Sequence, residues 1–139
     1  MTNINRVTRY VMQHYPPAND WGADLTRKWI SWHMNNQSCC VVKDDAGEIA
    51  GVGLARTVMK PEDGLETYAY DPEGSVHWVD LAVTTAPGAF TVLFLTMLKR
   101  YGRRDLIAYQ RLPDPAVRVH RLREMRGHLL KKEFIYYGR

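Results

Sequence analysis

The feature that most constrains the fold is an apolar run followed by a tight turn and a helical pattern. Residues 76–85, VHWVDLAVTT, are apolar at most positions, which is typical of a strand covered on both faces. In residues 86–102, APGAFTVLFLTMLKRYG, the apolar side chains Leu93, Met97 and Tyr101 recur at helical spacing. The sequence therefore predicts a strand–turn–helix unit at the centre of an α/β domain.

Two helices and a β-hairpin are expected before this unit. Residues 2–14 have helical spacing, and Pro16 ends the run because proline cannot extend a helix. A second amphipathic helix covers residues 25–33 and ends near the two asparagines that follow. Two β-rich runs, 38–43 and 48–59, flank a turn of Asp, Ala and Gly, which is the pattern of a hairpin.

Residues 60–75 hold several turn formers, so we predict a loop, with a short edge strand at 66–70. After the central helix we expect a buried strand at 104–111, a helix that begins after Pro115, and a final strand at 128–139. The predicted fold class is α/β (α+β), a single domain over the whole chain. It has a mixed sheet flanked by helices, in the order ααββ-β-α-β-α-β.

Composition narrows the class of protein. Hydrophobic residues make up 45% and charged residues 24% of the chain, the balance of a globular domain. No apolar run reaches the roughly 20 residues that span a bilayer, so we expect a cytoplasmic protein without a membrane partner. Cys39 and Cys40 are adjacent in a predicted strand, where alternation sends them to opposite faces and disfavours a disulfide or a metal clamp.

Basic residues are concentrated in the C-terminal half. The chain has 19 Lys and Arg against 15 Asp and Glu, and residues 99–139 contain twelve of the basic residues and four of the acidic ones. Such a patch attracts polyanions, which include nucleic acid, a phosphorylated cofactor or an acidic protein. The other interpretation is a solvated basic face without a partner.

A candidate site lies where the central strand feeds the helix. Ligands of open α/β sheets bind beyond the carboxyl ends of strands, where helix N-termini present free N–H groups. Gly88 and Ala89 would let a phosphate approach the backbone. Additional donors are the hydroxyl groups of Thr84, Thr85 and Thr91. The alternative is that Pro87 and Gly88 only begin the helix.

This order of elements, with a central strand that ends in Leu81-Ala82-Val83, resembles the GNAT acetyltransferase superfamily. In that superfamily the central strand pairs with the pantetheine arm of acyl-CoA, and the turn after it binds the pyrophosphate. The resemblance implies acetyl-CoA or another acyl-CoA as cofactor. The residues it places beside the cofactor, with Thr91 added for its hydroxyl, are Leu81, Ala82, Val83, Gly88, Ala89, Phe90 and Thr91.

The chain departs from the GNAT pattern at two places. The turn keeps one glycine and lacks the leading Arg or Gln, and Arg123 stands where the family has its tyrosine acid. Arginine stays charged at neutral pH and is a poor proton donor. The catalytic candidates that remain are Asp80, Tyr109 and His77.

Each candidate has a structural interpretation beside the catalytic one. His77 and Asp80 are three residues apart on a strand, hence on opposite faces, and are not expected to form a dyad. Asp80 is either buried with a partner such as an arginine or open to a cleft. Tyr109 is either an alternative acid or a core tyrosine with a bonded hydroxyl.

A weaker likeness is to the toxin-activating lysine acyltransferases, a divergent GNAT branch that uses acyl-carrier protein. Their central strand has a Trp-x-x-Asp-like motif similar to residues 77–80, and their hairpin has an Asp-Asp turn like Asp44-Asp45. They pair the aspartate with an N-terminal histidine, for which His14 is the candidate here.

We therefore carry three functional hypotheses. The first is an N-acyltransferase that moves an acyl group from a pantetheine carrier to a small-molecule or protein amine, which would enter beside the acidic 60–75 loop. The second is a catalytically inactive binding or assembly module, for example of phage origin, with a cleft filled by Phe90 or Arg123. The third is nucleic-acid binding through the basic half. The chain has no motif with metal-ligand spacing.

Overall fold

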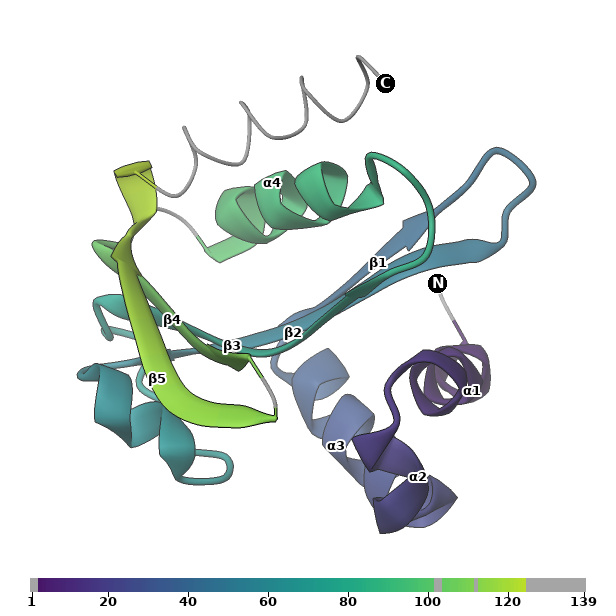
Figure 1. Cartoon of the computed structure of the whole chain (residues 1–139), viewed down its shortest axis with the longest axis horizontal. Coiled ribbons are helices and arrows are strands. Elements are labelled where there is room, and N and C mark those ends of the chain that lie inside the picture. The colour runs from purple at the N-terminus through teal and green to yellow at the C-terminus, as the bar shows by residue number, and fades with distance from the viewer. Residues whose placement is uncertain (1–2, 102–103, 112, 125–139) are drawn as a thin grey trace.

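The computed structural model describes residues 3–101, 104–111 and 113–124. These form a five-stranded mixed sheet with helices on both faces, so the predicted α/β class is confirmed (Figure 1). Helices α1 (Ile4–His14), α2 (Pro17–Trp21) and α3 (Ala23–Asn35) cover one face, and α4 (Ala89–Tyr101) covers the other. The described helices include none that is long and apolar enough to cross a membrane.

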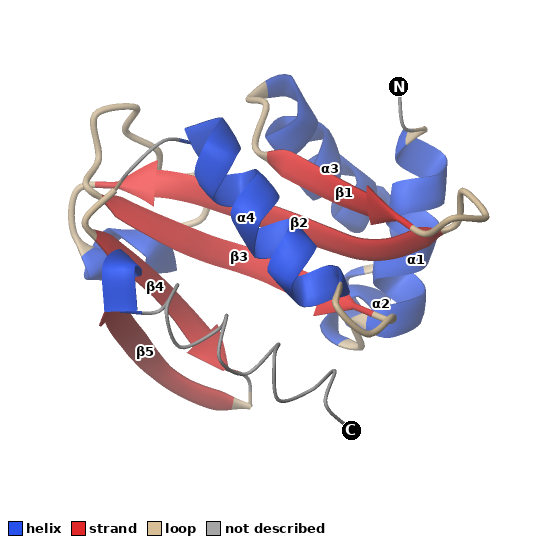
Figure 2. Cartoon of the chain, turned by 90° about the horizontal axis from the view of Figure 1, so that it is seen from above, coloured by secondary structure: helices blue, strands red, loops and turns tan. Residues whose placement is uncertain are grey.

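The strands lie in the sheet in the order in which they occur in the chain (Figure 2). They are β1 (Cys39–Lys43), β2 (Ile49–Val58), β3 (Val76–Thr84), β4 (Leu106–Arg111) and β5 (Asp114–Arg121). Only β3 and β4 are parallel, and α4 connects them. The expected β-α-β unit is therefore present, because parallel neighbours need a crossover connection.

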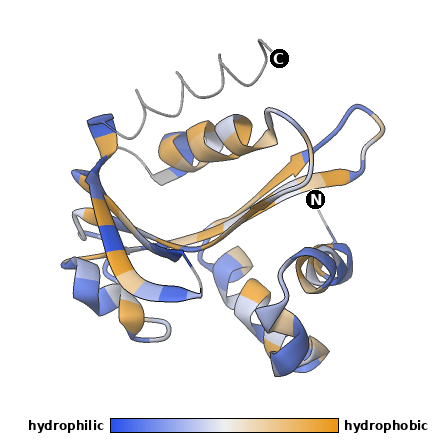
Figure 3. Cartoon of the chain, in the orientation of Figure 1, coloured by the Kyte–Doolittle hydropathy of each residue, from blue (hydrophilic) through white to orange (hydrophobic). Residues whose placement is uncertain are grey.

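Hydrophobic residues run along the central strands and occur in the helices of both layers (Figure 3), and buried apolar clusters join the two. The largest buried cluster joins Val7 and Val11 of α1 and Ile30 of α3 to Val52 and Leu54 of β2. A second cluster lies under α4, where Gly53 of β2 meets Met97 and Leu93. A Cβ atom at Gly53 would lie 2.7 Å from Met97 Sδ, so this glycine permits the close approach of α4 to β2.

The predicted helix after Pro115 is wrong over residues 116–121, and its residues 125–128 lie outside the described part of the chain. Residues 114–121 form β5, antiparallel to β4, and helical backbone begins only at Leu122. Val117 and Val119 alternate with Arg118 and His120, which is a strand period, and Val117 packs against the apolar cluster that contains Trp78.

Two other predicted strands have different outcomes. Residues 66–70 form turns and bends instead of an edge strand, after the short 3₁₀ helix η1 (Pro61–Leu65). The carbonyl groups of Glu66 and Ala69 bond to Arg56 instead of to a neighbouring strand. The final strand expected at 128–139 lies outside the described residues.

Candidate functional site

The site is built around a divergence of the two parallel strands. β3 and β4 pair only from Val76 with Leu106 to Trp78 with Ala108, although β3 continues to Thr84 and β4 to Arg111. Among the described residues, β4 does not pair with β3 beyond Trp78, so β4 leaves the facing edge of β3 uncovered there. This edge of β3 has the geometry to accept an extended ligand as an added strand.

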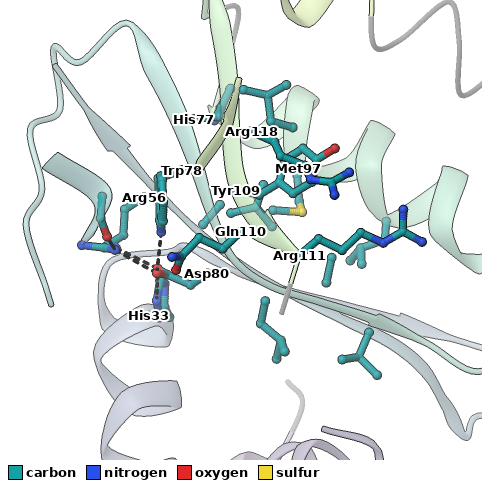
Figure 4. A pocket seen from close by; sticks show the side chains of 18 of the residues that line it. His33, Arg56, His77, Trp78, Asp80, Met97, Tyr109, Gln110, Arg111 and Arg118 are labelled. Atoms are coloured by element: carbon teal, nitrogen blue, oxygen red, sulfur yellow. Dashed lines mark hydrogen bonds and ion pairs between the residues drawn. The ribbon is translucent and has the colours of Figure 1, made fainter. Parts of the chain in front are cut away.

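A cleft of about 1560 Å³ lies at this divergence (Figure 4), and we refer to it as the cleft. Its helical wall comes from the α1–α2 connection, α2, α3, η1 and the turn after η1. The residues of this wall are Tyr15, Trp21, Leu25, Trp29, His33, Gly64, Leu65 and Tyr68. Its other walls are β3, the inner face of α4, and β4 with β5. The expected acceptor entrance, between the second long helix and the 60–75 loop, is thus one side of the cleft.

β3 has a bulge at Asp80, whose side chain lies on the same face of the strand as Trp78, toward the helical wall. Leu54 pairs with Leu81 and Ala55 with Val79, so Asp80 is the extra residue in the ladder. Leu81 joins the core cluster under α1 and α3, while the Asp80 side chain, 12% exposed, lies at the cleft. The bulge thus brings two consecutive residues, Asp80 and Leu81, to the same side of the sheet.

Arg56 of β2 is the main partner of this carboxylate. Its Nε lies 2.7 Å from Asp80 Oδ2, and its Nη2 lies 2.8 Å from Oδ1, which is a bidentate pair. The same guanidinium donates to the carbonyl groups of Gly64, Glu66 and Ala69. Arg56 therefore binds the 60–75 loop to the bulge, and the expectation that Asp80 is either partnered by an arginine or open to a cleft is met on both counts.

Two more groups contact Asp80. Trp78 Nε1 donates to Oδ1 at 3.1 Å, and His33 Nε2 of α3 lies 3.1 Å from Oδ2, outside the angle of a good hydrogen bond. His33 Nδ1 lies 2.7 Å from Ser38 Oγ, so both ring nitrogens face polar partners. With its oxygens surrounded by donors, Asp80 is better suited to fix the cleft wall than to accept a substrate proton.

Tyr109 and His120 form a second polar pair on the opposite side. Tyr109 follows Ala108, the last residue of β4 paired with β3, so it lies where the strands begin to separate. Its hydroxyl lies 3.1 Å from His120 Nε2 of β5, and the two rings stack with centroids 5.7 Å apart. Both residues line the cleft. This phenol is therefore positioned to exchange a proton with a ligand.

The start of α4 offers less to a phosphate than the sequence suggested. Gly88 has a φ of +79°, which favours glycine, but the Ala89 N–H already donates to Ala86 O. Thr85 donates from its backbone to Ala50 O, and its hydroxyl lies 3.0 Å from the hydroxyl of Tyr10. Burial raises the pKa of Tyr10, and the Thr85 hydrogen bond opposes this rise. These donors are used within the protein.

The aromatic residues of the helical wall contact one another. Trp21 lies edge-on to Trp29, with centroids 5.2 Å apart, and both lie near Tyr15. Burial, and secondarily the Asp80 charge, raises the pKa of Tyr15. Tyr68 has a φ of +63°, which is uncommon for a bulky residue, and its ring packs against Trp32. The wall thus presents apolar surface around one carboxylate.

The structure brings together some of the predicted site residues and not others. Those that line the cleft are His77, Asp80, Leu81, Ala82, Val83, Phe90 and Tyr109. The remaining three, Gly88, Ala89 and Thr91, are not among its lining residues. His77 is 4% exposed, and its side chain lies away from Asp80 and the residues that bond to Asp80 (Figure 4). His14 is exposed on α1 and packs on Tyr10, so it does not approach Asp80.

Sequence reasoning missed His33 and Arg56. The helix that carries His33 was expected, and the spacing of Leu25, Trp29 and His33 along one face was the available signal for a histidine directed at the site. Nothing local marks Arg56, because its partners come from β3 and the loop between the two strands.

Comparisons with protein-family models, with curated proteins and with solved structures found no match. Within the described part of the chain, no group of three or more His, Cys, Asp or Glu side chains is arranged to hold a metal ion.

Proposed function

We propose that this chain is a divergent acyltransferase that moves an acyl group from CoA, or from another pantetheine carrier, to an amine. The observation that carries the proposal is the divergence of β3 and β4 after three paired residues. A pantetheine arm is extended and carries two amide groups, so it can bond to the free edge of β3 as an added strand would.

The other walls suit the two halves of such a reaction. The donor would lie along β3, where Leu81, Ala82 and Val83 line the cleft. The amine would approach past the aromatic wall of α3 and η1. The exposed acids Glu62, Glu66 and Glu73 in and beside the 60–75 loop would attract a cationic amine before it loses its proton.

The chemistry is aminolysis of a thioester. The amine nitrogen attacks the carbonyl carbon, a C–N bond forms, the C–S bond breaks, and the amine loses a proton while the thiolate gains one. Tyr109 takes the role of acid: its hydroxyl protonates the thiolate and His120 Nε2, 3.1 Å away, restores that proton. The amine releases its proton to water at the open side of the cleft.

A binding module without catalysis would be expected to have its cleft filled by Phe90 or Arg123. Phe90 is 38% exposed and lines the cleft without closing it, while Arg123 is exposed and is not a lining residue. These observations favour the transferase over the module.

Calorimetric titration of the full chain with acetyl-CoA tests the proposal. We expect saturable binding that is lost in Ala82→Trp, because Ala82 is an exposed lining residue of β3 and an indole there would occupy the donor path. Val92→Trp, at an exposed position of α4 outside the cleft, is the matched control and should bind normally. Absence of heat with acetyl-CoA and with an acylated carrier protein would refute the proposal.

Tyr109→Phe tests the chemical role. In a screen of amines with acetyl-CoA, we expect this variant to bind the donor as the parent does and to turn over about 10²-fold more slowly, which is the usual contribution of one general acid. An unchanged rate would exclude Tyr109 as the proton donor.

A further inference from the structure

The two donors of the proposed function, on which this inference rests, are CoA and a phosphopantetheinylated carrier protein, and both carry a phosphate at the end of the pantetheine arm. Three arginines line the cleft, Arg56, Arg111 and Arg118. Arg56 is 3% exposed at its side chain and is committed to Asp80 and three loop carbonyl groups, so it has no capacity left for a ligand.

Arg111 and Arg118 lie on neighbouring strands in the same part of the cleft (Figure 4). Tyr109 pairs with Arg118 across the β4–β5 ladder, and Arg111 is two residues beyond Tyr109, after a register shift between Gln110 and Arg111. Arg118 has one exposed ion pair, with Asp114 at 3.4 Å, and such pairs contribute little. The carboxylates among the lining residues are those of Asp80 and Glu124.

The geometry points to Arg111 and Arg118 as the phosphate-binding groups of the donor site. The start of α4 is the alternative place for a phosphate, but the Ala89 N–H and the Thr85 groups there already have partners within the protein. Two guanidinium groups that face one cleft can each form charge-assisted hydrogen bonds to phosphate oxygens. They lie on the strand pair that also carries Tyr109 and His120, so one hairpin would hold the phosphate and supply the proton.

The ligand chemistry is the 4′-phosphate at the end of a pantetheine arm. This phosphate is part of the diphosphate of CoA and of the phosphodiester that joins the arm to a carrier protein. Both donors would therefore depend on the two arginines, and a free pantetheine would not.

The experiment compares pantetheine, 4′-phosphopantetheine and CoA by calorimetry on the full chain. We expect the phosphorylated compounds to bind at least tenfold more tightly than pantetheine, since hydrogen bonds to charged groups contribute about 1.5–3 kcal/mol. The double variant Arg111→Gln/Arg118→Gln should lose this gain and bind pantetheine as before. Arg121→Gln/Arg123→Gln, at two exposed positions outside the cleft, is the matched control and should keep the gain.

A carrier protein loaded with phosphopantetheine is titrated against the same variants. Weaker binding of this carrier to Arg111→Gln/Arg118→Gln alone would show that the carrier donor also depends on the two arginines. A gain from phosphate that persists in Arg111→Gln/Arg118→Gln, or that is lost equally in the control, overturns the inference and leaves the proposed function standing. Absence of binding by every pantetheine compound overturns the proposed function and the inference together.

Discussion

Asp80 and Arg56 make a buried pair whose strength depends on both partners. Arg56 would keep its charge if Asp80 were neutralised, and a buried charge without its counter-ion is strongly destabilising. We expect Asp80→Asn to lower the free energy of unfolding by about 3 kcal/mol, measured by urea denaturation. The exposed pair between Asp114 and Arg118 is the comparison, and Asp114→Asn should cost less than about 1 kcal/mol.

The result has a clear interpretation in either direction. Equal effects of the two substitutions would mean that the Asp80 pair is solvated and does not hold the 60–75 loop. A large effect of Asp80→Asn alone would confirm that the carboxylate serves the architecture of the cleft wall.

Cys39 and Cys40 are free thiols in β1, and both are buried. Burial raises the pKa of Cys39 to about 12 and also raises that of Cys40, while Arg100 nearby opposes both shifts. Because the thiolate is the reactive form, we expect a thiol reagent at pH 8 to label the native protein slowly and the urea-unfolded protein rapidly. Fast labelling of the native protein would contradict this burial.

The same shift predicts how stability depends on pH. The pKa of the Cys39 thiol is 9.0 in the unfolded chain and about 12 in the folded chain, so the folded state keeps the thiol proton to a higher pH. Its contribution to stability is present below pH 9 and is lost as the pH rises from about 9 to about 12. Cys39→Ala should flatten the loss of stability over this range in urea titrations.

At the scale of elements, the contact of η1 with β3 decides the position of the helical wall. Gly64 lies so close to the Trp78 ring that an added Cβ would overlap it. We expect Gly64→Ala to destabilise the protein by about 1–3 kcal/mol, the usual cost of overpacking, and to weaken binding of an acceptor amine. Glu62→Ala, exposed on the same 3₁₀ helix, should leave stability within about 0.5 kcal/mol. A harmless Gly64→Ala would show that η1 can move away from β3.

At the scale of the whole molecule, a ligand held between β3 and β4 would join two parts of the sheet that separate past Trp78. A donor present at 100 times its Kd stabilises the folded state by about 2.7 kcal/mol. With a change of about 2–4 °C in Tm per kcal/mol for a chain near this size, thermal denaturation should shift upward by about 5–10 °C. Ala82→Trp should abolish the shift, and a shift retained in that variant would place the donor elsewhere.

The sequence predicted the elements whose pattern is local and strong. The apolar run of β3, the helical spacing of α4 and the turn of the β1–β2 hairpin each reflect burial that is visible in neighbouring residues. β5 was not predicted, because Val117 and Val119 alternate over too short a stretch to indicate a strand by themselves. Asp80 and Tyr109 were candidates because a polar group in an apolar strand needs a partner or a function.

Only the tertiary structure decided what those candidates contact. Asp80 meets His33 of α3 and Arg56 of β2 at a one-residue bulge, and a bulge is set by pairing between strands. The divergence that opens the cleft has the same origin, since β3 and β4 stop pairing after Ala108 with no local mark in either strand. Hydrophobic periodicity is a property of neighbouring residues and is written in the sequence, whereas register, bulges and ion pairs join distant residues and arise only when the chain has packed.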